Sequence, residues 1–412
     1  MAELEEINAA VRNLQINFSL DNRFRYHGLV AAGGYGSIHR VQYINHVTCQ
    51  TADFLVKKSH DDEEAQRLLI EEKRYLQMMR GAVHIVRLIN IPDDPLARYN
   101  FQGQWMFLEL VANGTLRTFI QKARDHGVQR LPNRLLWSFL LCLVRGCFGM
   151  AWPKSRQDDI QEIERPVRGV PPGGISHNDL HQSNVVLGDF AMDGEHVLTP
   201  ILKLIDFGVS SQDPPLTAIN MNLFQVGQLM LNLITLDPDI EEDDEDFVVI
   251  DYLGEDIPTL AEPIFPQVIG GPRPFPWLDE WLATIVGLFM AADRNRVPTL
   301  PTLSVWLQYA VVERNARFYN IHEENDETVR ELCKLIMLHA PPNRHDPPLQ
   351  QAPPLQQAPP LQQAPPFQQA PPLQQAPPFQ QAPPLQQAPP FRNSFTPKHT
   401  PYIPKQPFST WP

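Results

Sequence analysis

The segment ISHNDLHQSNVVL, residues 175–187, carries polar residues at a spacing suited to phosphoryl transfer. Asp179 could accept the proton of an attacking hydroxyl, because a carboxylate within hydrogen-bond reach can act as a general base. Asn184, five positions later, offers an amide oxygen to a metal ion. In LKLIDFG, Asp206 follows an apolar run typical of a strand, where its carboxylate could hold Mg²⁺ against phosphate oxygens. These three residues are the candidate base and metal ligands.

Groups that could bind phosphates precede these residues. The stretch AAGGYGSI, residues 31–38, lies between two strand-like runs, and its glycines would let backbone N–H groups approach a phosphate. FLVKK places a lysine on a predicted strand, either Lys57 or Lys58. Glu72 lies on a predicted helix, where its carboxylate could hold that lysine in position. Each feature alone is common, but chance seldom gives all of them in this order together with H-x-D-L-x-x-x-N and D-F-G.

Taken together, these motifs resemble those of eukaryotic-type protein kinase domains, over about residues 23–320. The resemblance implies an α+β, bilobal protein-kinase-like fold, with a small β-rich N-lobe followed by a larger helical C-lobe. It also implies ATP and Mg²⁺ as cofactors, and direct in-line transfer of a phosphoryl group.

The resemblance implies a role for each matching residue, with Lys58 as the competing register for Lys57. The implied catalytic residues are Asp179, Lys57, Glu72 and His181. The implied nucleotide contacts are Ala31, Gly33, Gly34, Gly36, Ile38, Lys57, Glu109 and Val111. The implied metal ligands are Asn184 and Asp206.

The sequence departs from the kinase pattern in the catalytic loop and after it. Asn178 replaces the Arg before the base, which implies little control by phosphorylation of the activation segment. His181 replaces a Lys that neutralises the transferred phosphoryl group, a task that a protonated His could share. No A-P-E motif follows Asp206, and Asn222 replaces the Asp that braces the loop. Leu55 stands where the family has Ala above the adenine ring.

These features favour an ATP-dependent kinase that transfers the γ-phosphoryl group to a Ser or Thr hydroxyl of a protein substrate. Two alternatives stay open. Leu55, His181 and the missing A-P-E motif are compatible with a pseudokinase that binds nucleotide and serves as a scaffold. The loop HNDLHQSN, residues 177–184, is similar to the H-G-D-L-H-x-x-N loops of aminoglycoside and choline kinase-like enzymes. That similarity favours a small-molecule phosphotransferase.

Periodicity divides most of the chain into three parts that would position these residues. Residues 1–22 predict a helical arm, and residues 23–111 predict a β-rich N-lobe. Residues 112–340 predict a helical C-lobe with insertions near 153–174 and 189–200.

The C-terminal part, residues 341–412, has a different composition. QQAPP recurs seven times, every six residues, between Gln350 and Pro390. Dense proline favours polyproline II and prevents a packed core, so we expect a disordered tail. Such a tail could bind the aromatic-lined grooves of SH3- or WW-type partner domains.

Composition restricts the remaining possibilities. A net charge of −13 argues against a protein that coats nucleic acid or anionic lipid, so we expect neither partner. The most apolar run, residues 135–152, is interrupted by Arg145 and predicts a buried helix rather than a membrane span. The four cysteines show no metal-ligand spacing and are expected to be reduced thiols. Because the first residues do not resemble a secretory signal, we expect a cytoplasmic or nuclear protein.

Overall fold

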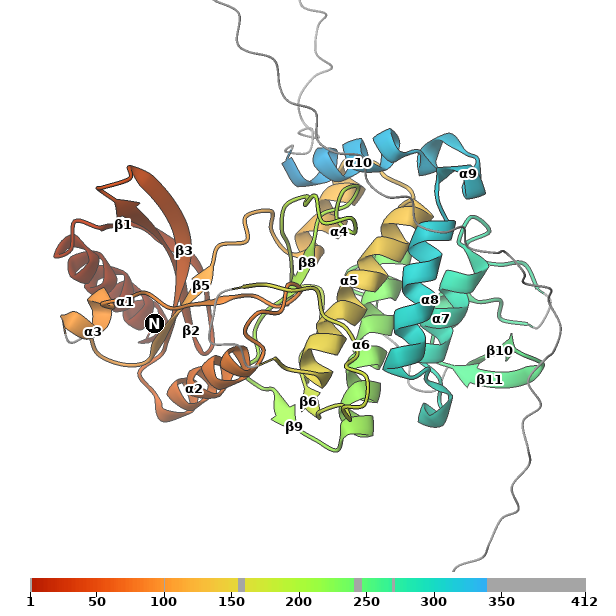
Figure 1. Cartoon of the computed structure of the whole chain (residues 1–412), viewed down its shortest axis with the longest axis horizontal. Coiled ribbons are helices and arrows are strands. Elements are labelled where there is room, and N and C mark those ends of the chain that lie inside the picture. The colour runs from red at the N-terminus through yellow and green to blue at the C-terminus, as the bar shows by residue number, and fades with distance from the viewer. Residues whose placement is uncertain (1, 100, 155–159, 241–246, 269–270, 339–412) are drawn as a thin grey trace, which may run out of the picture. The chain divides into compact units, whose positions relative to one another are not determined.

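The computed structural model describes residues 2–99, 101–154, 160–240, 247–268 and 271–338 (Figure 1). These residues belong to one compact unit. The predicted Pro/Gln-rich tail, residues 341–412, lies outside the described residues, as does part of the predicted insertion near 153–174.

An antiparallel five-stranded sheet forms the N-terminal part, in the order β1-β2-β3-β5-β4. Its strands are β1 (Phe24–Gly33), β2 (Gly36–Asn45), β3 (Gln50–Ser59), β4 (Leu88–Ile89) and β5 (Trp105–Glu109). The predicted strand-rich region is confirmed, although β4 has only two residues. Side chains alternate along a strand, so Phe54 and Val56 of β3 face one side of the sheet, and Leu55 and Lys57 face the other.

Helices α1 (Ala2–Ser19) and α3 (Pro95–Arg98) pack on the sheet face that carries Phe54. The predicted N-terminal helix therefore forms, and its apolar side is part of the core. Leu14 and Phe18 of α1 are fully buried, and the Phe18 ring lies 5.6 Å from the Phe24 ring. Because this face is covered, both faces of the sheet are buried near its centre.

We expect Leu14→Ala to lower the free energy of unfolding by about 2 to 3 kcal/mol, because the side chain is removed from a filled core. Ile16 lies on the same helix and is 59% exposed, so Ile16→Ala is the matched control and should have little effect. Thermal unfolding monitored by fluorescence measures both changes. Equal losses for the two variants would show that α1 does not stabilise the sheet through its apolar side.

Helix α2 (Glu63–Met78) packs against the other face of the sheet, where it brings Glu72 to Lys57. Its start is fixed locally, since the Asp62 carboxylate accepts a hydrogen bond from Ala65 N at 2.8 Å. Glu63 and Glu64 in the first turn add favourable charge at the positive end of the helix dipole.

The part that follows the sheet consists mainly of helices (Figure 1). Its helices are α4 (Leu116–Asp125), α5 (Asn133–Ala151), α6 (Pro215–Thr235), α7 (Glu280–Phe289), α8 (Leu300–Glu313), α9 (Ala316–Tyr319) and α10 (Asp326–Leu338). Short 3₁₀ turns cover residues 262–264, 294–296 and 322–324. The fold is thus of the α+β class, with an antiparallel sheet first and helices after it, as predicted.

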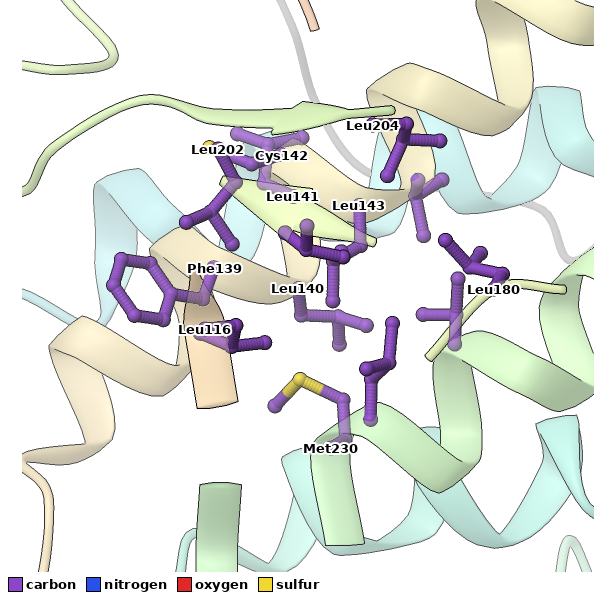
Figure 2. Close-up of a cluster of buried hydrophobic side chains, with 14 of the residues drawn as sticks. Leu116, Phe139, Leu140, Leu141, Cys142, Leu143, Leu180, Leu202, Leu204 and Met230 are labelled. Carbon is purple, nitrogen blue, oxygen red and sulfur yellow. The ribbon is translucent and has the colours of Figure 1, made fainter. Parts of the chain in front are cut away.

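Helix α5 is the centre of the main hydrophobic core. Figure 2 shows its side chains packed against residues of neighbouring elements, among them Met230 of α6 and Leu116 of α4. Among the described residues, α5 alone is long and apolar enough to cross a membrane, yet 89% of that stretch is buried inside the protein. The prediction of a buried core helix over this run is therefore confirmed.

Three pairs of short strands lie between these helices in the described residues, and two of the pairs flank the candidate site. They include the strands β6 (Ile175–Ser176), β7 (Val185–Leu187), β8 (Leu202–Leu204), β9 (Ser211–Gln212), β10 (Val248–Tyr252) and β11 (Glu255–Thr259). β7 pairs with β8, as the sequence predicted, and β6 pairs with β9. The segment HNDLHQSN lies between β6 and β7, and Asp206 follows β8 by two residues.

Candidate active site

Lys57 joins the sheet, helix α2 and the segment after β8. Its Nζ donates hydrogen bonds to Glu72 Oε2 at 2.7 Å and to Asp206 Oδ1 at 2.9 Å. Lys58 faces the opposite side of the sheet, where its Nζ donates to Ser59 O and to Asp61 Oδ1. The structure therefore brings Lys57, and not Lys58, to the other candidate residues.

Mutual attraction favours the charged forms of Lys57 and Asp206 in this cluster. Burial alone would lower the pKa of Lys57, but the carboxylates of Glu72 and Asp206 raise it above its usual range. Burial alone would raise the pKa of Asp206, but the adjacent Lys57 ammonium lowers it. Burial raises the pKa of Glu72, whose side chain is only 2% exposed. One ammonium group thus lies between two carboxylates. The side chain of Asp206 could therefore bind a further positive charge.

Asn184 holds the candidate base in place. Its Nδ2 donates to the backbone oxygen of Asp179 at 2.8 Å and to Asp179 Oδ2 at 2.9 Å. The Asp179 side chain is 49% exposed, so an acceptor from solvent could reach it. His181 lies beside it, with Nε2 3.6 Å from Asp179 Oδ2. The base, its neighbour and one candidate metal ligand are therefore together in one loop.

The two candidate metal ligands lie at the same end of the β7–β8 pair. Asn184 directly precedes β7, and Ile205, next to Asp206, donates its N–H to Asn184 O at 3.0 Å. With the amide nitrogen of Asn184 directed at Asp179, its carbonyl oxygen is the atom suited to a cation. A carboxylate and an amide oxygen form a donor set that fits Mg²⁺ better than a softer metal.

Asn222 of α6 braces the loop that carries Asp179. Its Oδ1 accepts a hydrogen bond from His177 N, and its Nδ2 donates to Ile175 O, each at 2.9 Å. The prediction that this Asn could still accept a backbone N–H is confirmed. Burial lowers the pKa of His177 to about 4, so its ring is neutral; its Nε2 lies 3.0 Å from Ile205 O. The ring also lies 4.6 Å from that of Phe207, which links the loop to the segment after β8.

The uncharged side chain of Asn178 holds the segment after Asp206 through hydrogen bonds. Its Nδ2 donates to Val209 O at 3.0 Å and to Ser211 Oγ at 2.8 Å. Asn178 and Asp206 both have left-handed backbone conformations, with φ of 66° and 65°. Such conformations are uncommon outside glycine and cluster at functional sites. The absence of Arg at this position is evident in the sequence, but the bonds that replace it join residues 31 and 33 positions apart.

The glycine-rich turn between β1 and β2 lies on the same sheet as Lys57. Ala31 is paired with Ile38, and Ile38 with Lys57, so these three residues form one row across the sheet. His60 supports the turn, because its backbone N–H donates to Tyr35 O and its ring Nε2 lies 2.9 Å from Gly33 O.

The three glycines of this turn differ in whether the surrounding structure has space for a side chain. A Cβ on Gly36 would lie 2.2 Å from the backbone oxygen of Lys58. That distance is too short for any side chain to be accommodated at this position. A Cβ on Gly33 or Gly34 would meet nothing within 4 Å. The protein itself therefore requires Gly36, whereas the other two glycines leave open space where a ligand could approach.

We expect Gly36→Ala to lower the free energy of unfolding by about 2 kcal/mol, because β2 must move away from β3. Gly34→Ala should leave stability nearly unchanged but weaken the stabilisation by Mg-ATP, because the added methyl projects into the open space. Thermal unfolding with and without Mg-ATP measures both effects. If Mg-ATP raised the melting temperature of Gly34→Ala as much as that of the wild type, this would contradict a phosphate-binding role for the turn.

The last two predicted nucleotide contacts lie at the end of β5. The carboxylate of Glu109 is already engaged, since its Oε1 accepts from Arg87 N at 2.8 Å and from Lys203 Nζ at 2.6 Å. Any contact of Glu109 with a nucleotide would therefore come from its backbone, as for a hinge segment. Val111 follows two residues later and is partly buried. Leu55 is paired with Leu108 on the sheet face that carries Lys57.

Neither a protein-family model nor a curated protein matches the chain.

Proposed function

We propose that this chain is an ATP-dependent kinase of the bilobal protein-kinase type that transfers the γ-phosphoryl group to a protein Ser or Thr hydroxyl. The observation that carries the proposal is the pair of contacts from Lys57 Nζ to Glu72 and Asp206. These residues come from a strand, a helix and a loop, and a structural ion pair would not need the third group. A lysine held between a buried carboxylate and a metal ligand is suited to orient nucleotide phosphates.

The residues of the site have complementary tasks in the proposed reaction. Asp206 and the oxygen of Asn184 would hold Mg²⁺, which when bound neutralises charge on the phosphates. Lys57 and the glycine-rich turn would orient the phosphates. The acceptor oxygen forms a bond to the γ-phosphorus while the bond to the bridging oxygen of ADP breaks, and the acceptor proton passes to Asp179.

The bonds of Asn178 support a kinase that needs no phosphorylation of its activation segment. Protein kinases that are controlled this way use an Arg to pair with the added phosphate. Here a neutral amide holds the segment through Val209 O and Ser211 Oγ. The proposed site is therefore assembled before any modification.

A second candidate function is phosphoryl transfer to a small molecule. Helix α6 begins at Pro215, only nine residues after Asp206, so the intervening segment offers little surface to a polypeptide. His181 beside Asp179 also matches the loops of aminoglycoside and choline kinase-like enzymes. The proline-rich tail remains a predicted ligand for SH3- or WW-type domains, and the cytoplasmic or nuclear location remains a prediction.

The test is transfer of γ-labelled phosphate from Mg-ATP by the purified full chain. A basic protein acceptor and a pool of amino alcohols and aminoglycosides are offered separately, and ADP is measured in both. We expect label on protein with the wild type, none with Asp179→Asn, and full transfer with Asp189→Asn, an exposed Asp outside the site. ADP release only with the small molecules would favour the second candidate. ATP binding without ADP release for any acceptor would indicate a pseudokinase and overturn both.

A further inference from the structure

Three side chains that commonly bind metals meet inside the protein, apart from the candidate active site. His84 Nε2 lies 3.1 Å from His196 Nε2, and Cys142 Sγ lies 3.3 Å from the same His196 atom. The three ligand atoms all lie within 4.8 Å of one another. Each of the residues is at most 2% exposed. They belong to the loop after α2, to α5 and to the loop between β7 and β8, where the sequence predicted an insertion.

Carboxylates orient both imidazole rings toward this point. His84 Nδ1 lies 2.7 Å from Glu164 Oε2, and His196 Nδ1 lies 2.6 Å from Asp193 Oδ2. Each carboxylate accepts a hydrogen bond from Nδ1–H, and in the neutral imidazole this tautomer leaves the Nε2 atom with a lone pair. Carboxylate–histidine pairs of this kind are the usual outer shell of a histidine metal site.

Two lone pairs directed at each other at 3.1 Å repel unless a cation or a proton lies between them. A thiol beside them supplies a third donor, and it binds metals as the thiolate. The nearby Arg145 guanidinium is engaged by other groups and is not the cation between the two histidine rings. It pairs with Glu195 at 2.6 Å and donates to the backbone oxygen of Glu164.

We propose that His84, Cys142 and His196 bind a zinc ion. Nitrogen and sulfur are the donors that Zn²⁺ prefers, with bonds of about 2.0 to 2.1 Å and about 2.3 Å. In a tetrahedral site such bonds place two nitrogens about 3.3 Å apart and nitrogen and sulfur about 3.6 Å apart. The distances of 3.1 Å and 3.3 Å are within a few tenths of these values. A water molecule takes the fourth position.

The ion stabilises the part of the fold from which Asp206 extends. His84 O accepts a hydrogen bond from Leu204 N at 2.9 Å, and Val86 N donates to Leu204 O at the same distance. Zinc would therefore connect the loop after α2, the core helix α5 and strand β8, two residues before Asp206. Glu164 and Asp193, whose carboxylates orient the two imidazole rings, lie in the two regions where the sequence predicted insertions. This role does not depend on the proposed kinase activity.

The first measurement is the metal content of the full chain, purified without chelators, by mass spectrometry. We expect about one zinc per wild-type chain and less than a tenth of that in Cys142→Ser and His196→Gln. Cys147→Ser is the matched control, because Cys147 is an equally buried cysteine of the same helix outside the cluster, and it should keep its zinc. Copper or iron at that stoichiometry would overturn the assignment of zinc.

A second measurement keeps the test decisive if a variant does not fold. Wild-type protein is stripped with a chelator and refilled with Co²⁺ or Zn²⁺. We expect the absorption band of a cobalt–thiolate bond in the wild type and in Cys147→Ser, and none in Cys142→Ser. Chelation should lower the melting temperature by several degrees, and Zn²⁺ should restore it. Wild-type protein without bound metal and without a cobalt band would show a histidine pair that only shares a proton, and would overturn the proposal.

Discussion

Asp206→Asn is expected to lower the rate of ADP formation from Mg-ATP at least about a thousandfold, or about 4 kcal/mol in activation free energy. The change removes the negative charge from the group that would hold Mg²⁺ and that contacts Lys57 at 2.9 Å. Lys57 keeps its contact with Glu72, so the fold should survive the change. Thermal unfolding with ATP, titrated with Mg²⁺, should show that the variant loses the stabilisation that depends on the metal.

The control for this prediction is again Asp189→Asn, which removes an exposed carboxylate and should leave the rate within a few-fold of the wild type. A variant Asp206→Asn that forms ADP at a rate near that of the wild type would remove Asp206 from the mechanism. Loss of Mg²⁺-dependent stabilisation without any measurable wild-type turnover would instead separate nucleotide binding from catalysis.

Local sequence patterns predicted most of what positions the site. Alternating apolar residues predicted the long strands, and the charged start of α2 predicted a helix whose Asp62 cap satisfies its own first turn. The loop HNDLHQSN and the D-F-G triplet predicted groups that the structure does bring together around Lys57 and Asp179. These features depend on residues that are close together in the sequence, so the sequence alone can predict them.

The choice between Lys57 and Lys58 was beyond the sequence. A strand buried on one face would place one lysine inside and one in solvent. Here α1 covers the second face, so Lys58 is only 5% exposed and Lys57 is also largely buried. The contacts with Glu72 from a separate helix and with Asp206 from the segment after β8 distinguish the two residues.

Long-range contacts explain what the sequence missed. Strand β4 has only two residues, and the loop before it is held by contacts with Leu204 and Glu164, which are far away in the sequence. The cluster of His84, Cys142 and His196 has no local motif, since its two histidines are 112 residues apart. The spacing of the cysteines could not predict this cluster, because two of its three residues are histidines in loops.

The second large effect is expected from Lys57→Met, which should reduce ADP formation by about a thousandfold and also destabilise the protein. Removing the ammonium leaves the buried Glu72 carboxylate without its partner, a change that costs about 3 kcal/mol for buried pairs. Burial already raises the pKa of Glu72, and it would rise further without Lys57. A carboxyl whose pKa is raised in the folded state stabilises the fold less as the pH rises from its usual pKa to the raised value, so the variant should be less stable above that value than in acid.

Two further variants separate the structural from the catalytic part of this effect. Lys57→Met with Glu72→Gln should recover much of the melting temperature, because the buried carboxylate at position 72 is replaced by a neutral amide, but none of the activity. Lys58→Met changes the neighbouring lysine on the opposite face and should keep the activity, since Lys58 Nζ donates to Asp61 and to a backbone oxygen there, away from Glu72 and Asp206. If the double variant recovered activity together with stability, Lys57 would be a structural cation. If Lys58→Met lost Mg-ATP binding while Lys57→Met kept it, the assignment of the phosphate-binding lysine would be reversed.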